Sequence, residues 1–218
     1  MLTIDHLMWG APDLDAGIAE AERLFGVTAA AGGSHPGLGT RNALLGFENG
    51  SYFEIIAPDP AQPLEGNFGA ALAALRQPAL VTFAVAAADL AALAGQARAA
   101  GCTPRGPIDT QRATPAGALL AWQLLFLRNH AFGGLCPFFI DWLDTPHPSL
   151  SAPQAGRLEA LAIDTPAAPA LGALLRALEV RVPVTQAAAP SLSARIRTGQ
   201  GVVTLRSSAE SVRLRFGS

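Results

Sequence analysis

Residues 3–27, TIDHLMWGAPDLDAGIAEAERLFGV, contain a strand, a turn and a helix in immediate succession. Alternation over the first eight of these residues predicts a strand with two distinct faces. The expected faces are Ile4, His6 and Met8 on one side, and Asp5, Leu7 and Trp9 on the other. Asp13 then suits a helix N-cap, apolar residues recur at helical spacing, and Gly26 ends the helix. The segment therefore predicts the beginning of a β-α unit.

The same β-α beginning recurs at residues 80–102 and 158–180. Asp89 follows Asp13 by 76 residues and occupies the same place in the pattern. After each of the first two helices come three strand-like segments separated by turns, and Asn49-Gly50 is a strong hairpin signal. Both halves therefore have the order β-α-β-β-β. The fold class that this order predicts is α+β, with paired βαβββ modules that form a half-open barrel cleft.

The predicted organisation divides the chain into five parts. These are a first module (1–60), a linker helix with Asn67 as N-cap (61–78), a second module (79–144), a Pro/Ser-rich connector (145–156) and a C-terminal α/β extension of βαβ type (157–218).

Composition narrows the functional classes. The chain has 218 residues, 50% of them hydrophobic and only 15% charged, which excludes a disordered chain. A net charge of −2 favours neither nucleic acid nor an anionic membrane as a partner. All 15 basic residues are Arg, so Schiff-base, pyridoxal-phosphate and P-loop mechanisms lack their Lys. With no signal peptide or membrane span in the sequence, we expect a cytoplasmic protein with a small-molecule ligand.

Sequence motifs for disulfides, cysteine-bound zinc and nucleotide binding do not occur. The two cysteines form no CxxC pair, so the sequence predicts neither a disulfide framework nor a cysteine-based zinc site. The glycines around residues 37–39 do not open a helix after a strand, so we expect no nucleotide cofactor. The oligomeric state stays open, with a homodimer among the alternatives.

Four strings resemble one known family: IDHLMWG (4–10), GTRNALLGF (39–47), YFEIIAPDP (52–60) and CPFFIDWLDTPHP (136–148). They look like the glyoxalase-like domain family of the vicinal oxygen chelate superfamily, which also contains bleomycin resistance proteins and extradiol dioxygenases. The resemblance covers roughly residues 1–150. It implies that two βαβββ modules enclose a cleft with a divalent metal, which polarises vicinal oxygens of a substrate or activates dioxygen.

The resemblance also implies metal ligands from the first and fourth strands of each module. His6 and Glu54 match these positions in the first module, and their side chains suit Zn, Fe, Mn or Ni. The second module has Thr82 at the first position. Its last strand offers Asp141 as the only acidic residue. Metal dependence is therefore open, and His6 and Glu54 can equally form an acid/base pair.

Further candidates for substrate binding lie in both modules: His35, Asn42, Arg112, Trp122, Gln123 and Asp141. The glycines around His35 allow the backbone to approach a ligand closely. Arg112 can recognise a carboxylate or carbonyl oxygen with its planar fork. Gln123 interrupts an apolar strand beside Trp122, so it needs a polar partner or the cleft. The alternatives are an exposed loop histidine, a surface arginine and a tryptophan that only packs the barrel.

The sequence thus predicts a glyoxalase-like enzyme that acts on a small oxygenated molecule. Lyase or isomerase chemistry through an enolate and metal-dependent dioxygenation are the two leading reactions, with His6 and Glu54 as catalytic residues. We expect these two side chains to converge across neighbouring strands and to point away from solvent. The alternative is a protein that binds or sequesters a small molecule in the same cleft without catalysis.

Overall fold

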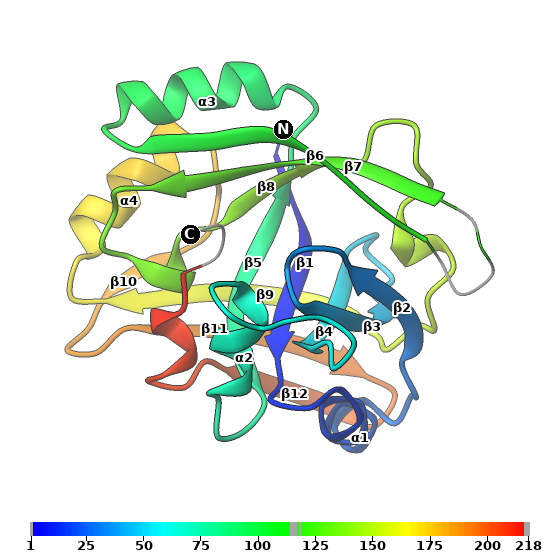
Figure 1. Ribbon diagram of the computed structural model, residues 1–218. Coiled ribbons are helices and arrows are strands. Elements are labelled where there is room, and N and C mark those ends of the chain that lie inside the picture. The colour runs from blue at the N-terminus through cyan, green and yellow to red at the C-terminus, as the bar shows by residue number, and fades with distance from the viewer. Residues whose placement is uncertain (1, 114–116, 118, 216–218) are drawn as a thin grey trace.

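Two βαβββ modules build the central part of the computed structural model, which describes residues 2–113, 117 and 119–215 (Figure 1). The first module consists of β1 (Thr3–Gly10), α1 (Leu14–Phe25), β2 (Ala30–His35), β3 (Thr40–Gly46) and β4 (Tyr52–Pro58). The second consists of β5 (Ala79–Ala86), α3 (Leu90–Ala99), β6 (Thr103–Ala113), β7 (Leu119–Arg128) and β8 (Phe138–Asp141). The linker helix α2 (Phe68–Ala73) lies between them in the chain.

All eight strands of the two modules form one curled sheet with the order β2-β3-β4-β1-β5-β8-β7-β6. At its centre β1 and β5 are antiparallel, while each is parallel to the last strand of its own module. The two modules are therefore related by an approximate two-fold axis between β1 and β5. This arrangement confirms the predicted fold class of paired βαβββ modules.

The helices begin where the sequence predicts. The Asp13 carboxylate accepts a hydrogen bond from the backbone N–H of Ala16 at 2.9 Å, and Asp89 caps α3 in the same way at 2.8 Å from Ala92. Gly26 ends α1 in the left-handed conformation, with φ 70°. The repeated Asp residues thus mark equivalent points of the two modules.

The glycine-rich segment before His35 belongs to strand β2, and His35 is buried, so His35 is not an exposed loop histidine. A bulge interrupts the pairing of β2 with β3 between Ala31 and Gly33. A Cβ at Gly32 would lie 2.0 Å from Oδ1 of Asn42, so no larger residue fits there. Glycine therefore allows β2 to run close to the side chain of Asn42 and to carry His35 at its end.

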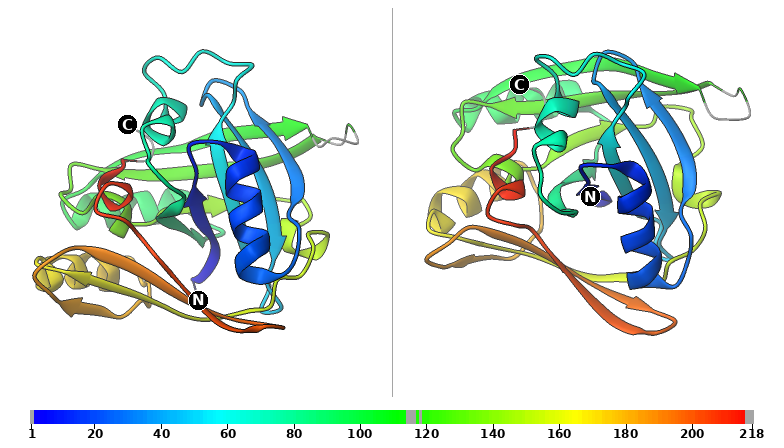
Figure 2. Two further views of the ribbon diagram at one scale, coloured as in Figure 1. Left: turned by 90° about the horizontal axis from the view of Figure 1, so that it is seen from below. Right: turned by 60° about the horizontal axis from the view of Figure 1, so that its bottom comes forward.

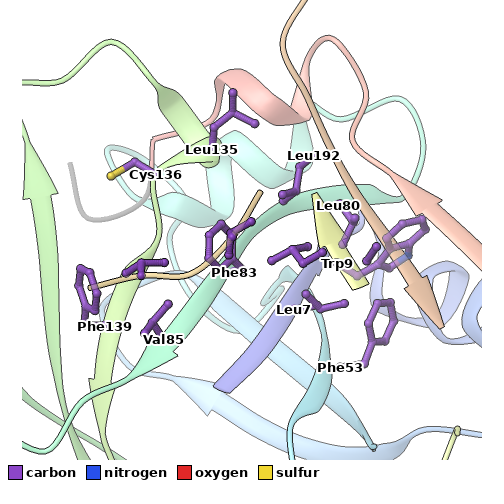
Figure 3. Close-up of a cluster of buried hydrophobic side chains, with 14 of the residues drawn as sticks. Leu7, Trp9, Phe53, Leu80, Phe83, Val85, Leu135, Cys136, Phe139 and Leu192 are labelled. Atoms are coloured by element: carbon purple, nitrogen blue, oxygen red, sulfur yellow. The ribbon is translucent and has the colours of Figure 1, made fainter. Parts of the chain in front are cut away.

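A second, four-stranded sheet forms a further layer, as Figure 2 shows. Its elements are β9 (Arg157–Thr165), α4 (Ala168–Ala177), β10 (Val184–Gln186), β11 (Ser191–Thr198) and β12 (Gly201–Arg206). Strands β9 and β10 are parallel and joined by α4, which confirms the predicted βαβ character of this segment. Leu192 of β11 belongs to the same buried apolar cluster as Trp9 and Leu80 of the large sheet, and this cluster joins the two layers (Figure 3).

The concave face of the large sheet has a separate apolar cluster, built from Met8, Ile56, Trp122 and Phe138 together with α2. The outermost strands, β2 and β6, contact each other, so the two edges of the curled sheet approach and narrow the cleft. The described residues also form three short 3-10 helices: η1 (Gly133–Leu135), η2 (Pro148–Leu150) and η3 (Ser211–Arg213). None of the helices in the described part of the chain has the length and apolar composition that a membrane-spanning helix needs.

Candidate functional site

His6 and Glu54 meet on the concave face of the first module. His6 lies on β1 and Glu54 on the neighbouring parallel strand β4, where Glu54 pairs with Met8, two residues beyond His6. Nε2 of His6 is 3.5 Å from Oε2 of Glu54, and the two residues are only 2% and 6% exposed. The structure thus brings together the two residues that the sequence singled out for catalysis or metal binding.

Asp5 lies beside His6, although strict alternation places it on the opposite face. The pairing of β1 with β5 shifts between Ile4 and His6, so Asp5 is the extra residue of a bulge. Its Oδ1 is 2.7 Å from Nδ1 of His6. Burial opposes ionisation of Asp5, but hydrogen bonds from His147 and His6 outweigh burial and lower the pKa of Asp5 to about 2.

This ionised carboxylate decides which nitrogen of His6 carries a proton. A carboxylate without a proton can only accept hydrogen bonds, so Nδ1 of His6 must donate to Asp5. Nε2 is then the nitrogen that faces Glu54 and the cleft. A histidine oriented by a carboxylate in this way is a common arrangement for acid/base chemistry.

The second oxygen of Glu54 is held by Asn42. The amide Nδ2 of Asn42 donates to Oε1 of Glu54 at 2.7 Å, and Oδ1 of Asn42 accepts the backbone N–H of Gly33 at 3.0 Å. These two bonds fix the orientation of the amide. The ring of His35 lies nearby, with Nε2 4.0 Å from the same Oε1, and burial lowers the pKa of His35. Asn42 and His35 therefore both border the carboxylate.

Aromatic rings enclose the imidazole of His6. Tyr52 stacks on it with ring centroids 4.4 Å apart, and Phe138 approaches it edge-on at 5.5 Å. Burial raises the pKa of the Tyr52 phenol well above its ordinary value, so the phenol stays neutral. These contacts restrict the ring of His6 to one orientation.

Arg112 brings a positive charge into the cleft from the second module. Its Nη1 donates to the backbone oxygen of Gly32, a bond that joins β6 to β2 across the narrow side of the barrel. The residue is 5% exposed, and burial lowers the pKa of its guanidinium while the nearby Glu54 carboxylate opposes this effect. Arg112 therefore closes the cleft and presents a guanidinium to the same space as Glu54.

These side chains line a cavity of about 40 Å³. Its polar walls are His6, His35, Asn42, Glu54 and Arg112, and its aromatic walls are the rings of Tyr52, Trp122, Phe138 and Trp142. A wider cavity of about 440 Å³ adjoins it and shares part of its wall, namely His35, Leu38, Thr110 and Leu124. The site is thus a small polar chamber beside a larger one.

Two predicted residues lie outside this chamber. Gln123 follows Trp122 on β7, and because neighbours in a strand point to opposite faces, only Trp122 reaches the cleft. Gln123 donates to Oδ1 of Asp109 at 2.8 Å instead. Asp141 accepts the backbone N–H of Leu143 at 2.9 Å and does not line the cavity. Gln123 and Asp141, which the sequence predicted in the cleft, therefore lie outside it.

Comparisons with known proteins agree with this architecture. The family described as glyoxalase-like domain matches residues 4–179. The chain belongs to the glyoxalase-like domain family. This family and the paired βαβββ modules confirm the resemblance to the vicinal oxygen chelate superfamily.

Solved structures with similar folds include a hypothetical protein from Staphylococcus aureus, with 18% identity and a TM-score of 0.66, covering 94% of this chain and 85% of that one. Methylmalonyl-CoA epimerase from Mycobacterium tuberculosis has 22% identity, a TM-score of 0.48 and coverages of 68% and 90%. A hypothetical protein from Bacillus halodurans has 14% identity, a TM-score of 0.49 and coverages of 66% and 97%. A comparison with curated proteins finds no match.

The donor set of this glyoxalase-like protein does not fit a four-ligand metal site. At the offset of 76 residues, Thr82 corresponds to His6. Glu54 pairs with Met8, and the counterpart of Met8, Ala84, pairs with Phe138. The position equivalent to Glu54 is therefore Phe138 and not Asp141. Among residues 2–113, 117 and 119–215, no group of three or more His, Cys, Asp or Glu side chains is arranged to hold a metal ion.

Two residues near the connector complete the surroundings of Asp5, and the sequence did not place either of them in the site. Nε1 of Trp142 donates to Oδ2 of Asp5 at 3.1 Å, and Nε2 of His147 is 3.2 Å from the same oxygen. The only hint in the sequence that Asp5 belongs to the site was its position next to His6 in the first strand. The Pro-rich composition around His147 gave no indication of a partner 142 residues away.

Proposed function

We propose that this protein is an enzyme that moves a proton on a carbon next to a carbonyl or carboxylate group, through an enolate, in the manner of an isomerase or lyase. The observation that carries the proposal is the buried pair of His6 and Glu54, 3.5 Å apart, in one cavity with the guanidinium of Arg112. A carboxylate, an imidazole and a cation are the groups that such a reaction needs.

Each group has a distinct part in the proposed reaction. Glu54 takes the proton from the substrate carbon, and the electron pair of that C–H bond moves onto the adjacent oxygen. Arg112 stabilises the negative charge that develops on this oxygen, most effectively in a cavity shielded from water. His6, whose Nε2 faces Glu54, exchanges the proton with Glu54 or returns it to the substrate. A proton returned to a different position completes an isomerisation.

The volumes of the two adjoining cavities support a substrate with a small reacting group and a larger remainder. A volume of about 40 Å³ gives room for roughly three water molecules, so only a small reacting group enters the polar chamber. The adjoining cavity of about 440 Å³ can take the rest of the molecule. We therefore propose a small oxygenated compound whose reacting end carries a carbonyl or carboxylate oxygen.

Dioxygenation has less support from these residues. Activation of dioxygen needs a redox-active metal, commonly held by three protein ligands on one side. His6 and Glu54 supply two, while the equivalent positions of the second module are Thr82 and Phe138. We assign the reaction to proton transfer for this reason.

Oxalate tests the proposal without knowledge of the substrate, because this flat dianion has the shape and charge of the enolate of a 2-oxo acid. Isothermal titration should show one oxalate bound per chain, with Kd raised at least about 10-fold by Arg112→Gln. Arg98→Gln, on the exposed side of α3, is the matched control and should bind as the wild type does. No binding, or equal binding by the Arg112→Gln variant, would overturn the proposed role of Arg112.

A further inference from the structure

We propose that His147 is a positioning residue of this site, which acts through Asp5 to hold the proton of His6 on Nδ1 and its Nε2 toward Glu54. The inference builds on the proposed function, because it names a residue that controls the same site from outside the cavity.

The geometry around Asp5 carries the argument. The carboxylate is 3% exposed and receives hydrogen bonds on both oxygens. Oδ1 is 2.7 Å from Nδ1 of His6, while Oδ2 is 3.2 Å from Nε2 of His147 and 3.1 Å from Nε1 of Trp142. A carboxylate held at both ends cannot rotate away from His6. The two donors at Oδ2 therefore fix the acceptor that orients the imidazole.

The direction of these hydrogen bonds follows from a backbone group. Nδ1 of His147 accepts the backbone N–H of Ser149 at 3.3 Å, and a backbone N–H can only donate. The proton of a neutral His147 ring is therefore on Nε2, where it donates to Asp5. The result is a continuous chain in which Ser149 donates to His147, and His147 and His6 both donate to Asp5.

The segment that carries His147 is attached to the first module. In Figure 1 this yellow-green segment, with η2, lies against β3. The backbone of Gly46 on β3 bonds Pro153 and Ala155 at 2.8 and 2.9 Å, and the side chain of Gln154 donates to Ser149 at 3.0 Å. These bonds hold His147 in place behind Asp5. The connector thereby links the C-terminal layer to the orientation of His6.

The side chain of His147 is 24% exposed, whereas that of His6 is 3% exposed. His147 does not line the small chamber, so it does not touch a substrate there. Its ring also contacts those of Tyr52 and Trp142, with centroids 5.5 and 5.6 Å apart. A substitution that keeps a ring at this position therefore isolates the hydrogen bond to Asp5. Loss of its donor should therefore reduce the rate of the chemical step more than it changes substrate binding.

Nitrogen NMR of protein labelled at its four histidines tests this directly. The wild type should show a protonated Nδ1 on His6 with slow solvent exchange. His147→Phe, which keeps a ring but removes the donor, should broaden or abolish this signal. His147→Gln, which keeps an N–H donor, should restore it. His130→Phe is the control, because His130 bonds the backbone of Leu127 outside the polar chamber.

With a substrate in hand, His147→Phe should lower kcat about 10-fold with less than about a 2-fold change in KM, and His147→Gln should recover most of the loss. An unchanged His6 signal in His147→Phe would overturn the inference. If that variant does not fold, Trp142→Phe removes the other donor to Oδ2 and is expected to weaken the same signal. The NMR result needs no turnover, so it separates failure of this inference from failure of the proposed function.

Discussion

The imidazole of His6 and the carboxylate of Glu54 face each other across two parallel strands, with Nε2 and Oε2 3.5 Å apart. The outer ends of both groups are already held, His6 by Asp5 and Glu54 by Asn42. Only the facing atoms are left for exchange of a proton with a third molecule. This arrangement is the physical basis of the proposed enolate chemistry.

Removal of the amide that holds Glu54 should slow the reaction. Asn42→Leu has a similar volume but loses the 2.7 Å hydrogen bond to Oε1, so the carboxylate loses its fixed orientation. We expect the rate of α-proton exchange to fall about 10-fold. Gln123→Leu removes an amide outside the cleft and should leave the rate unchanged. Equal rates for Asn42→Leu and the wild type would show that Asn42 does not orient the base.

Chelation should not abolish activity. Since the described side chains do not assemble three metal donors, we expect the exchange rate to stay within about 2-fold after EDTA treatment. Addition of Zn, Mn or Ni should likewise give no large increase. A loss of more than about 10-fold on chelation, restored by one of these metals, would contradict the metal-independent mechanism.

Asp5 should make stability depend on pH in the acid range. Its pKa is about 2 in the folded protein against 3.8 ordinarily, so its contribution is present above about pH 4 and is lost as the pH falls toward 2. The difference in unfolding free energy between the wild type and Asp5→Asn should shrink by about 2 kcal/mol over this range. Urea denaturation of both proteins at a series of pH values measures it. A difference that stays constant with pH would refute the assignment.

The sequence predicted those features that depend on local pattern. Alternation placed His6 on the same face of β1 as Met8, and Asp13 and Asp89 marked the equivalent helix starts of the two modules. The pairing of His6 with Glu54 came from the family resemblance. The same alternation failed at Asp5, because a bulge depends on pairing with β5, a strand more than 70 residues away. Asp5, which contacts His6, was therefore less predictable from the sequence than His6 and Glu54 were.

Features that depend on long-range register were also missed. Asp141 was the acidic residue available in the last strand of the second module, yet pairing of β8 with β5 puts Phe138 at the position of Glu54. His147 lies in a segment whose composition predicts only a connector, and its contact with Asp5 arises from backbone pairing with β3. Neither result follows from local spacing, because both are set by how distant segments pack.

Deuterium incorporation from heavy water tests the central claim most directly. The wild type is incubated with a panel of 2-oxo acids, 2-hydroxy ketones and acyl thioesters, and loss of the α-proton signal is followed by proton NMR. We predict exchange of at least one compound, reduced about 100-fold or more in Glu54→Gln and unchanged in Asp141→Asn, whose carboxylate lies outside the cleft. Exchange that persists in Glu54→Gln at the wild-type rate, or no exchange of any compound, would contradict the account and favour a protein that only binds its ligand.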